Sequence, residues 1–153
     1  MKKFLALTLA TMSLSSFAAT QADLVLKGTV APILSISVSA AAAASSLDLS
    51  QAATDVAVGS VTEKSNSRLG YKVTAKSTNG GKLVNVDDST SYVPYSLSYD
   101  GSAITLATTD SQIYSTSSVR GTKIKDLLIS FNKPSDLAAG SHEDTVTFTI
   151  VAN

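Results

Sequence analysis

Apolar and polar side chains alternate with a period of two residues through most of the chain beyond residue 22. In residues 69–75 the apolar side chains take the odd-numbered positions, and similar alternation recurs in residues 93–99, 127–131 and 146–150. A period of two is that of a strand with one buried and one solvated face. The sequence therefore predicts a fold of short β-strands, because almost no segment shows the 3.6-residue period of a helix.

Turn-forming residues separate these predicted strands. Asp100-Gly101 stands between residues 93–99 and 103–106, which predicts a tight hairpin. Asn79-Gly80-Gly81 and Ala139-Gly140-Ser141 predict two further turns. Ser and Thr account for 42 of the 153 residues, and both suit the solvated faces of strands. Many short strands with frequent turns predict an all-β fold, an immunoglobulin-like antiparallel β-sandwich.

One segment lacks the alternation. Residues 40–44 are consecutive alanines followed by Ser45-Ser46, and so short a run of alanine cannot hold a stable helix by itself. We expect a loop with a short helical turn at this position. The chain shows no internal repeat and no linker, so its length predicts a single folded domain.

The composition removes most kinds of enzyme chemistry. The chain has no Cys and no Trp, one His, and twelve basic against twelve acidic residues. The absence of Cys excludes disulfides, thiolate metal sites and thiol catalysis, and a single His cannot form a His-rich metal cluster. The balanced charge gives no general attraction for nucleic acid. We therefore expect a protein that is not an enzyme, with no catalytic residue, cofactor, metal or nucleic-acid partner.

The N-terminus has the parts of a secretory signal peptide. Lys2 and Lys3 precede an apolar run at residues 4–14, and small residues follow it. We expect residues 1–18 to be removed by cleavage after Ala18, with a cut after Ala22 as the alternative. The apolar run is too short to span a bilayer. The mature chain should therefore be exported through the periplasm and should carry no membrane span.

Two apolar runs with a proline between them follow the signal peptide. Residues 24–30 alternate as Leu-Val-Leu-Lys-Gly-Thr-Val, and a second run at residues 33–38 begins directly after Pro32. Ala31-Pro32 leaves no room for a hairpin between the runs, and proline cannot donate a hydrogen bond to a sheet. The first run must therefore leave the path of the second, either into a different sheet or into a different molecule.

Three stretches of the chain carry a family likeness: LVLKGTVAPILSI at residues 24–36, VPYSLSYDG at residues 93–101, and LAAGSHEDTVTFTI at residues 137–150. They resemble the major subunits of fimbriae (pili), especially the colonization-factor type and, more loosely, the spore-coat-U-like secreted pilin domains. In such pilins an alternating N-terminal strand precedes a Val-x-Pro element, here Val30-Ala31-Pro32. The absence of Cys departs from disulfide-bearing pilins and agrees better with the colonization-factor type.

The resemblance implies polymerisation by donor-strand exchange. Pilin domains of this kind are similar to an immunoglobulin sandwich that lacks one strand and leaves a hydrophobic groove open. A periplasmic chaperone fills the groove first, and the N-terminal extension of the next subunit then replaces it. The implied partners are identical subunits in a filament, the chaperone, an outer-membrane usher, and a host or surface receptor. The implied product is a fimbrium at the cell surface that supports adhesion or biofilm formation.

The resemblance also implies roles for particular residues. Residues 19–31 would be the donor-strand extension, residues 32–153 the pilin-like sandwich, and Pro32 the hinge between them. Gly28 would allow close backbone approach within the donor strand. The groove-filling donor residues would be Leu24, Leu26 and Val30. The last strand, which lines the core or the groove, would carry Val146, Phe148 and Ile150.

The same residues allow simpler interpretations. Residues 24–30 could form an ordinary first strand paired within their own sandwich, because successive strands of such folds can lie in opposite sheets. Self-complementation, in which the strand folds back into its own groove, predicts a soluble monomer. Both lead to the alternative function, a monomeric secreted or periplasmic binding module that recognises a carbohydrate or a protein.

The remaining polar and aromatic residues suggest no second site. We expect His142 to be a solvated loop residue, and Asp87-Asp88 and Asp100 to be turn formers without the spacing of a calcium loop. Of the five tyrosines, we expect Tyr71, Tyr95 and Tyr99 to pack in or beside the core. Tyr114 is the better candidate for an exposed contact, in a loop at residues 108–118.

Overall fold

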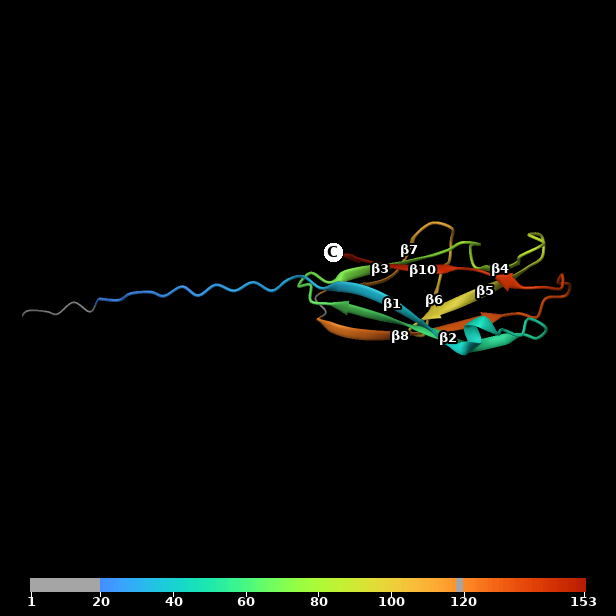
Figure 1. The fold of residues 1–153 in the computed structure, drawn as a ribbon, viewed down its shortest axis with the longest axis horizontal. Helices are drawn as coiled ribbons and strands as arrows, with labels where there is room; N and C mark the ends of the chain where they lie inside the picture. The colour runs from blue at the N-terminus through green and yellow to red at the C-terminus, as the bar shows by residue number, and fades with distance from the viewer. Residues whose placement is uncertain (1–19, 118–119) are drawn as a thin grey trace, which may run out of the picture. The chain divides into compact units, whose positions relative to one another are not determined.

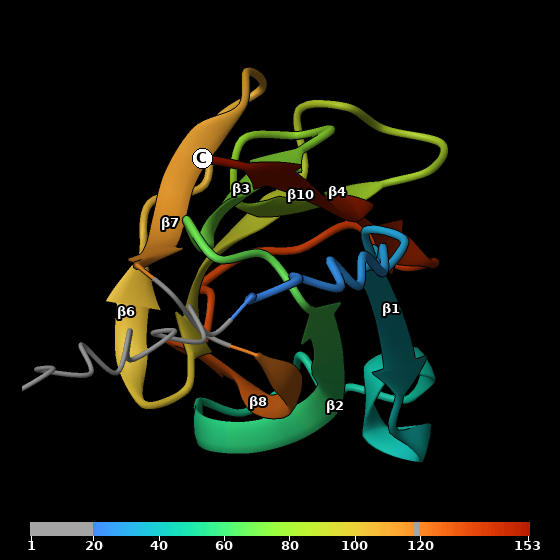
Figure 2. The same ribbon diagram turned by 90° about the vertical axis from the view of Figure 1, so that its left-hand side faces the viewer.

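The computed structural model of the chain describes residues 20–117 and 120–153 (Figures 1 and 2). The chain divides into two units, residues 1–30 and 31–153, and every described strand belongs to the second. The expected signal peptide, residues 1–18, lies outside the described residues. In chain order the elements are β1 (Leu34–Ala40), the 3₁₀ turn η1 (Ala42–Ser45), β2 (Ala53–Ser65), β3 (Tyr71–Ser77), β4 (Lys82–Asn85), β5 (Tyr92–Tyr99), β6 (Ser102–Ile104), β7 (Ser111–Thr116), β8 (Gly121–Phe131), β9 (His142–Glu143) and β10 (Val146–Ala152).

These strands form two sheets in which every described pairing is antiparallel. The larger sheet has the order β1-β2-β8-β5-β4-β9, with β6 also paired to β5, and the smaller sheet has the order β10-β3-β7. Figure 1 shows β3, β7 and β10 forming one layer above β2 and β8. The structure confirms the predicted all-β, immunoglobulin-like antiparallel sandwich.

The core lies between the two sheets. The buried apolar side chains of the larger sheet include Val61, Leu97 and Ile129, and those of the smaller sheet are Tyr71, Val73 and Ala75. Each set alternates with exposed or half-buried residues along its strand, and in the β3 sequence Tyr-Lys-Val-Thr-Ala-Lys-Ser these are polar. The period of two seen in the sequence is therefore the burial pattern of the sandwich.

Several local predictions are confirmed. Asp100 and Gly101 have φ of 53° and 78° in the turn between β5 and β6, which is the left-handed backbone that a tight type I′ hairpin requires. The alanine-rich segment forms only the single 3₁₀ turn η1. Asn79-Gly80-Gly81 does make a turn, and it carries the chain from β3 in the smaller sheet to β4 in the larger one.

The strand predicted at residues 69–75 begins two residues later than expected. Leu69 lies outside β3, and its side chain is 62% exposed instead of sharing the buried face with Tyr71. Gly70 separates the two with φ of 82°, and a Cβ there would stand 1.9 Å from the Thr116 carbonyl oxygen. The chain therefore bends at Gly70, and the alternation inside β3 starts only after the bend.

The longest strand, β2, has no counterpart among the predicted strands. Its pairing with β8 shifts between Ala53 and Val56 and again between Ala57 and Gly59, so the strand carries two irregularities of the β-bulge kind. The second shift moves the inward-facing side chains from even-numbered to odd-numbered positions. Val56 precedes it and Val58 lies within it, whereas Val61 and Glu63 follow it. The alternation is broken in the sequence although the strand is continuous.

A buried carboxylate connects the two sheets. Glu63 on β2 is 0% exposed, and it accepts hydrogen bonds from the Tyr71 hydroxyl of β3, at 2.7 Å, and from the Tyr99 hydroxyl of β5. A charged group so deeply buried is retained only when its oxygens have partners. We call these three residues the Glu63 tie. It joins the larger sheet to the smaller one through the core.

Glu63→Ala should lower the free energy of unfolding by about 2–5 kcal/mol, because it leaves two buried tyrosine hydroxyls without their acceptor. Glu63→Gln keeps one acceptor oxygen and should cost less. Lys64→Ala is the matched control, since Lys64 is the next residue of β2 and is exposed. Urea unfolding of the three variants measures the difference. Equal stability of Glu63→Ala and Lys64→Ala would contradict a structural role for the tie.

Candidate functional site

At one side of the sandwich, the last strand of each sheet is paired along only one of its two edges. Among the described strands β1 pairs only with β2, and β10 pairs only with β3, so each is the edge strand of its sheet. The two edges lie next to each other in space, as Figure 2 shows at the side where β1 approaches β10. We call this pair of edges the open side. Each edge presents a row of backbone N–H and C=O groups that no described strand pairs.

The inward-facing side chains of β1 remain accessible at the open side. Directly paired residues point to the same face of a sheet, and Leu34, Ile36 and Val38 stand opposite Ser65, Glu63 and Val61, all of which are buried. Leu34 is nevertheless 37% exposed and Val38 is 52% exposed. Apolar side chains that point toward the core but stay accessible indicate that the sandwich is not fully covered at this edge.

The residues expected on the last strand lie on the other edge of the open side. Val146, Phe148 and Ile150 occupy β10 opposite Ser77, Ala75 and Val73, so they also point inward, and each is half-buried. Val146 and Phe148 pack against the core, and the Phe148 ring lies 5.9 Å from that of Tyr99. These three side chains contribute to the core and border the open side at the same time.

The predicted donor residues lie outside every strand. The structure assigns no strand to residues 20–33, so the run at 24–30 does not form the ordinary paired strand of the simpler interpretation. Leu24, Leu26 and Val30 are 83%, 84% and 88% exposed, and nothing lies within 4 Å of the position of a Cβ at Gly28. The three apolar side chains on this face of the segment are therefore largely exposed in the described part of the chain.

Pro32 lies in a segment that Asn66 holds in place. The Asn66 side chain accepts a hydrogen bond from the Ile33 amide at 2.7 Å and donates one to the Ala31 carbonyl at 2.8 Å. The Asn66 amide also donates to the Ile33 carbonyl at 3.1 Å. The residues on both sides of the predicted hinge are thus tied to the end of β2. Nothing in the sequence analysis singled out Asn66, because its partners are backbone groups more than thirty residues away.

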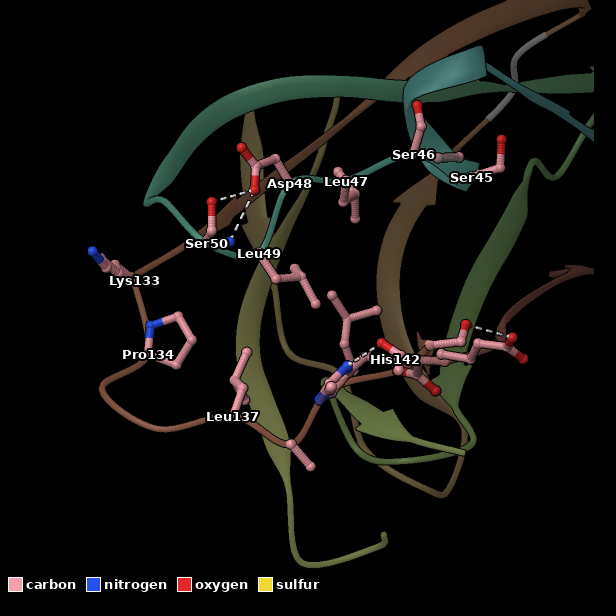
Figure 3. Close-up of a pocket in the computed structure, with 18 of the residues that line it drawn as sticks. Ser45, Ser46, Leu47, Asp48, Leu49, Ser50, Lys133, Pro134, Leu137 and His142 are labelled. Carbon is pink, nitrogen blue, oxygen red and sulfur yellow. Dashed lines mark hydrogen bonds between the residues drawn. The ribbon is translucent and has the colours of Figure 1, made fainter. Parts of the chain in front are cut away.

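A cavity at one end of the sandwich is another place where a ligand could bind. It has a volume of about 910 Å³ and lies between residues 44–50 and residues 133–145 (Figure 3). Leu47, Leu49 and Leu137 line it together with polar groups. The described lining residues include His142 but no Phe, Tyr or Trp. The described residues also contain no group of three or more His, Asp or Glu that could hold a metal ion.

His142, expected in a solvated loop, lies instead in the short strand β9 and is half-buried. It pairs with Asn85 of β4, and its ring nitrogens lie 3.3 Å from the Ser91 hydroxyl and 3.3 Å from the Gly140 carbonyl oxygen. Asp144 nearby accepts hydrogen bonds from the Ser77 and Tyr95 hydroxyls. The polar residues beside the cavity are therefore engaged in holding the loops together.

Two of the acidic turn residues behave as predicted. Asp100 occupies the β5–β6 hairpin turn, and Asp88 accepts hydrogen bonds from the Thr90 hydroxyl and amide. The Thr90 hydroxyl, followed by the Thr90 amide, lowers the pKa of the Asp88 carboxyl. The Asp88 carboxylate stabilises its turn through local hydrogen bonds, whereas the Asp100 carboxylate forms an ion pair with Lys125 of β8.

The tyrosines do not gather into a binding surface. Tyr71 and Tyr99 are buried and Tyr95 is half-buried, as predicted. Tyr114 was expected in an exposed loop, but it lies on β7, is half-buried, and has its ring 6.2 Å from that of Tyr71. Burial is the main cause that raises the pKa of Tyr71, Tyr95 and Tyr99. Hydrogen bonds to the Glu63 or Asp144 carboxylate raise the pKa of these hydroxyls further.

Comparisons with known proteins show a likeness among solved structures. No protein-family model matches the chain, and no curated protein matches it. Among solved structures, the CooA pilin subunit from enterotoxigenic Escherichia coli aligns with a TM-score of 0.41 and 21% sequence identity, over 62% of this chain and 69% of that chain. No helix in the described part of the chain is long and apolar enough to cross a membrane.

The raised tyrosine pKa values predict a loss of stability at alkaline pH. Below pH 10 the hydroxyls are neutral in both states, whereas above pH 10 the unfolded chain releases their protons first and unfolding becomes easier. Urea unfolding between pH 8 and pH 11 should therefore show stability falling above about pH 10. Tyr95→Phe should reduce the number of protons released on unfolding by up to about one, which makes the fall of stability with pH shallower. Tyr92→Phe is the exposed control. An identical slope in both variants would contradict this assignment.

Proposed function

We propose that this chain is a structural subunit of a bacterial surface fimbria, and that it polymerises by donating its N-terminal segment to the next copy. The observation that carries the proposal is the open side, where two edge strands lie together with inward-facing apolar side chains still accessible. The same chain also has an alternating apolar segment that is outside every strand. An uncovered strand edge and an alternating apolar segment in one sequence could pair with each other in two copies of the chain.

The lengths of the three segments support this pairing. Residues 24–30, β1 and β10 each span seven residues, so an extended donor would reach along both edges from end to end. Added to either edge, it would gain main-chain hydrogen bonds along that edge and place alternate side chains toward the core. Burying Leu24, Leu26 and Val30 would contribute roughly 1.5–3 kcal/mol each, before the cost of ordering the strand.

The direction of exchange follows from where the two parts lie in the sequence. A donor segment at the N-terminus of one copy and an open side on another make a head-to-tail contact, and such a contact builds an open fibre when it does not close into a ring. We infer that a periplasmic chaperone covers the open side before assembly and that an outer-membrane usher exports the subunits. Adhesion or biofilm formation would be the cellular consequence.

Removing residues 19–31 should abolish polymerisation and leave a folded monomer. We expect the full chain to form filaments or SDS-resistant multimers, because each donor segment covers the open side of its neighbour. Light scattering and electron microscopy report the assembly state, and circular dichroism checks that the truncated chain is folded. A full chain that stays monomeric, and whose truncation only lowers its melting temperature, would favour the secreted binding module instead.

A single charge at the open side should have the same effect as the truncation. Val38 points inward and is 52% exposed, so Val38→Asp is tolerated in the monomer but places a carboxylate where the donor strand would pack. Ser37→Asp is the matched control, because Ser37 is the exposed neighbour on the outward face of β1. We expect Val38→Asp to prevent filament formation and Ser37→Asp to permit it. Filaments of normal length from Val38→Asp would place the subunit contact elsewhere.

A further inference from the structure

Asn66 forms a clamp around the start of the folded domain. Its three hydrogen bonds, to Ile33 N, Ile33 O and Ala31 O, are 2.7, 3.1 and 2.8 Å long. The clamp closes over Pro32, whose ring already restricts φ to about −65°. Residues 31–33 belong to no strand. The backbone groups on both sides of the proline are nevertheless held by their hydrogen bonds to Asn66.

The side chain at this position has to donate and accept at once. Asparagine offers a carbonyl oxygen and an amide N–H on the same group, and here the oxygen accepts from Ile33 while the nitrogen donates to Ala31. Aspartate keeps only the acceptor, and alanine keeps neither. Neither aspartate nor alanine can therefore make both side-chain hydrogen bonds of the clamp.

We infer that Asn66 is a positioning residue for polymerisation, an inference that rests on the proposed function. The clamp holds Ala31, so the part of the extension that the clamp does not hold ends at Val30. With the clamp in place, residues 24–30 can span at most about 23–25 Å, and releasing residues 31–33 would lengthen this reach by about 10 Å. By limiting the free length of the joint, Asn66 would limit how far, and at what angle, one subunit stands from the next.

The test compares filaments of the full chain, taken from cells that assemble them, with filaments of three variants. Asn66→Ala removes both side-chain bonds, Asn66→Asp removes the bond to Ala31, and Asn132→Ala is the control in the exposed loop after β8. Electron microscopy measures the spread of subunit spacing and of filament curvature. Hydrogen exchange of the Ile33 amide in the monomer measures the clamp itself.

We expect Asn66→Ala to speed Ile33 exchange about fivefold, the effect of losing one ordinary hydrogen bond. It should also broaden both the spacing and the curvature of the filaments. Asn66→Asp should broaden them with a smaller change in Ile33 exchange, and Asn132→Ala should match the unaltered chain. A clamp that only stabilised the domain would change exchange and leave filament geometry unchanged.

The outcomes distinguish a failure of this inference from a failure of the proposed function. Well-ordered filaments from Asn66→Ala, with the spacing of the unaltered chain, would overturn the positioning role and leave polymerisation in place. Unchanged Ile33 exchange in that variant would overturn the clamp directly. If the unaltered chain forms no filaments, the proposed function is wrong and the positioning role is wrong with it.

Discussion

The rest of the structure depends on two edge strands that meet on the same side of the sandwich. An unpaired strand edge offers a row of hydrogen-bonding groups to any extended chain that reaches it, and here β1 and β10 offer two such rows together. The inward-facing Leu34 and Val38 stay accessible for the same reason. A strand added at one of these edges would pair with its backbone groups and cover the accessible apolar side chains, which explains why the proposed partner is an alternating apolar segment of the same sequence.

A sandwich that is open at one side still has to hold its sheets together before any partner arrives. The Glu63 tie does this from a suitable place, because Glu63 is on β2 and Tyr71 is on β3, each one strand inside an open edge. Its partners are hydroxyl groups, so it is satisfied within the single chain. The tie, together with the core around Val61 and Ile129, joins the two sheets within the single chain.

The fold could be predicted from the sequence wherever alternation is regular. β3, β5 and β10 were foreseen in this way, as was the hairpin at Asp100-Gly101, whose residues suit a left-handed turn. β2 was missed because a bulge reverses the parity of its apolar residues and because the inward position 63 carries a charge. β7 was missed because its Ser- and Thr-rich sequence is typical of a loop, and the half-buried Tyr114 lies there.

By itself the sequence determined the β-class of the fold, the places of most turns, and the presence of an apolar segment separated from the next strand by Pro32. These are local properties, since side-chain period, turn geometry and the missing proline N–H act within a few residues. Only the tertiary structure decided which strands lie at the sheet edges, and that β1 and β10 meet. It alone brought Asn66 to Ala31 and Ile33, and Glu63 to Tyr71 and Tyr99. Such contacts depend on strand order and on bulges, which a pattern along the chain does not contain.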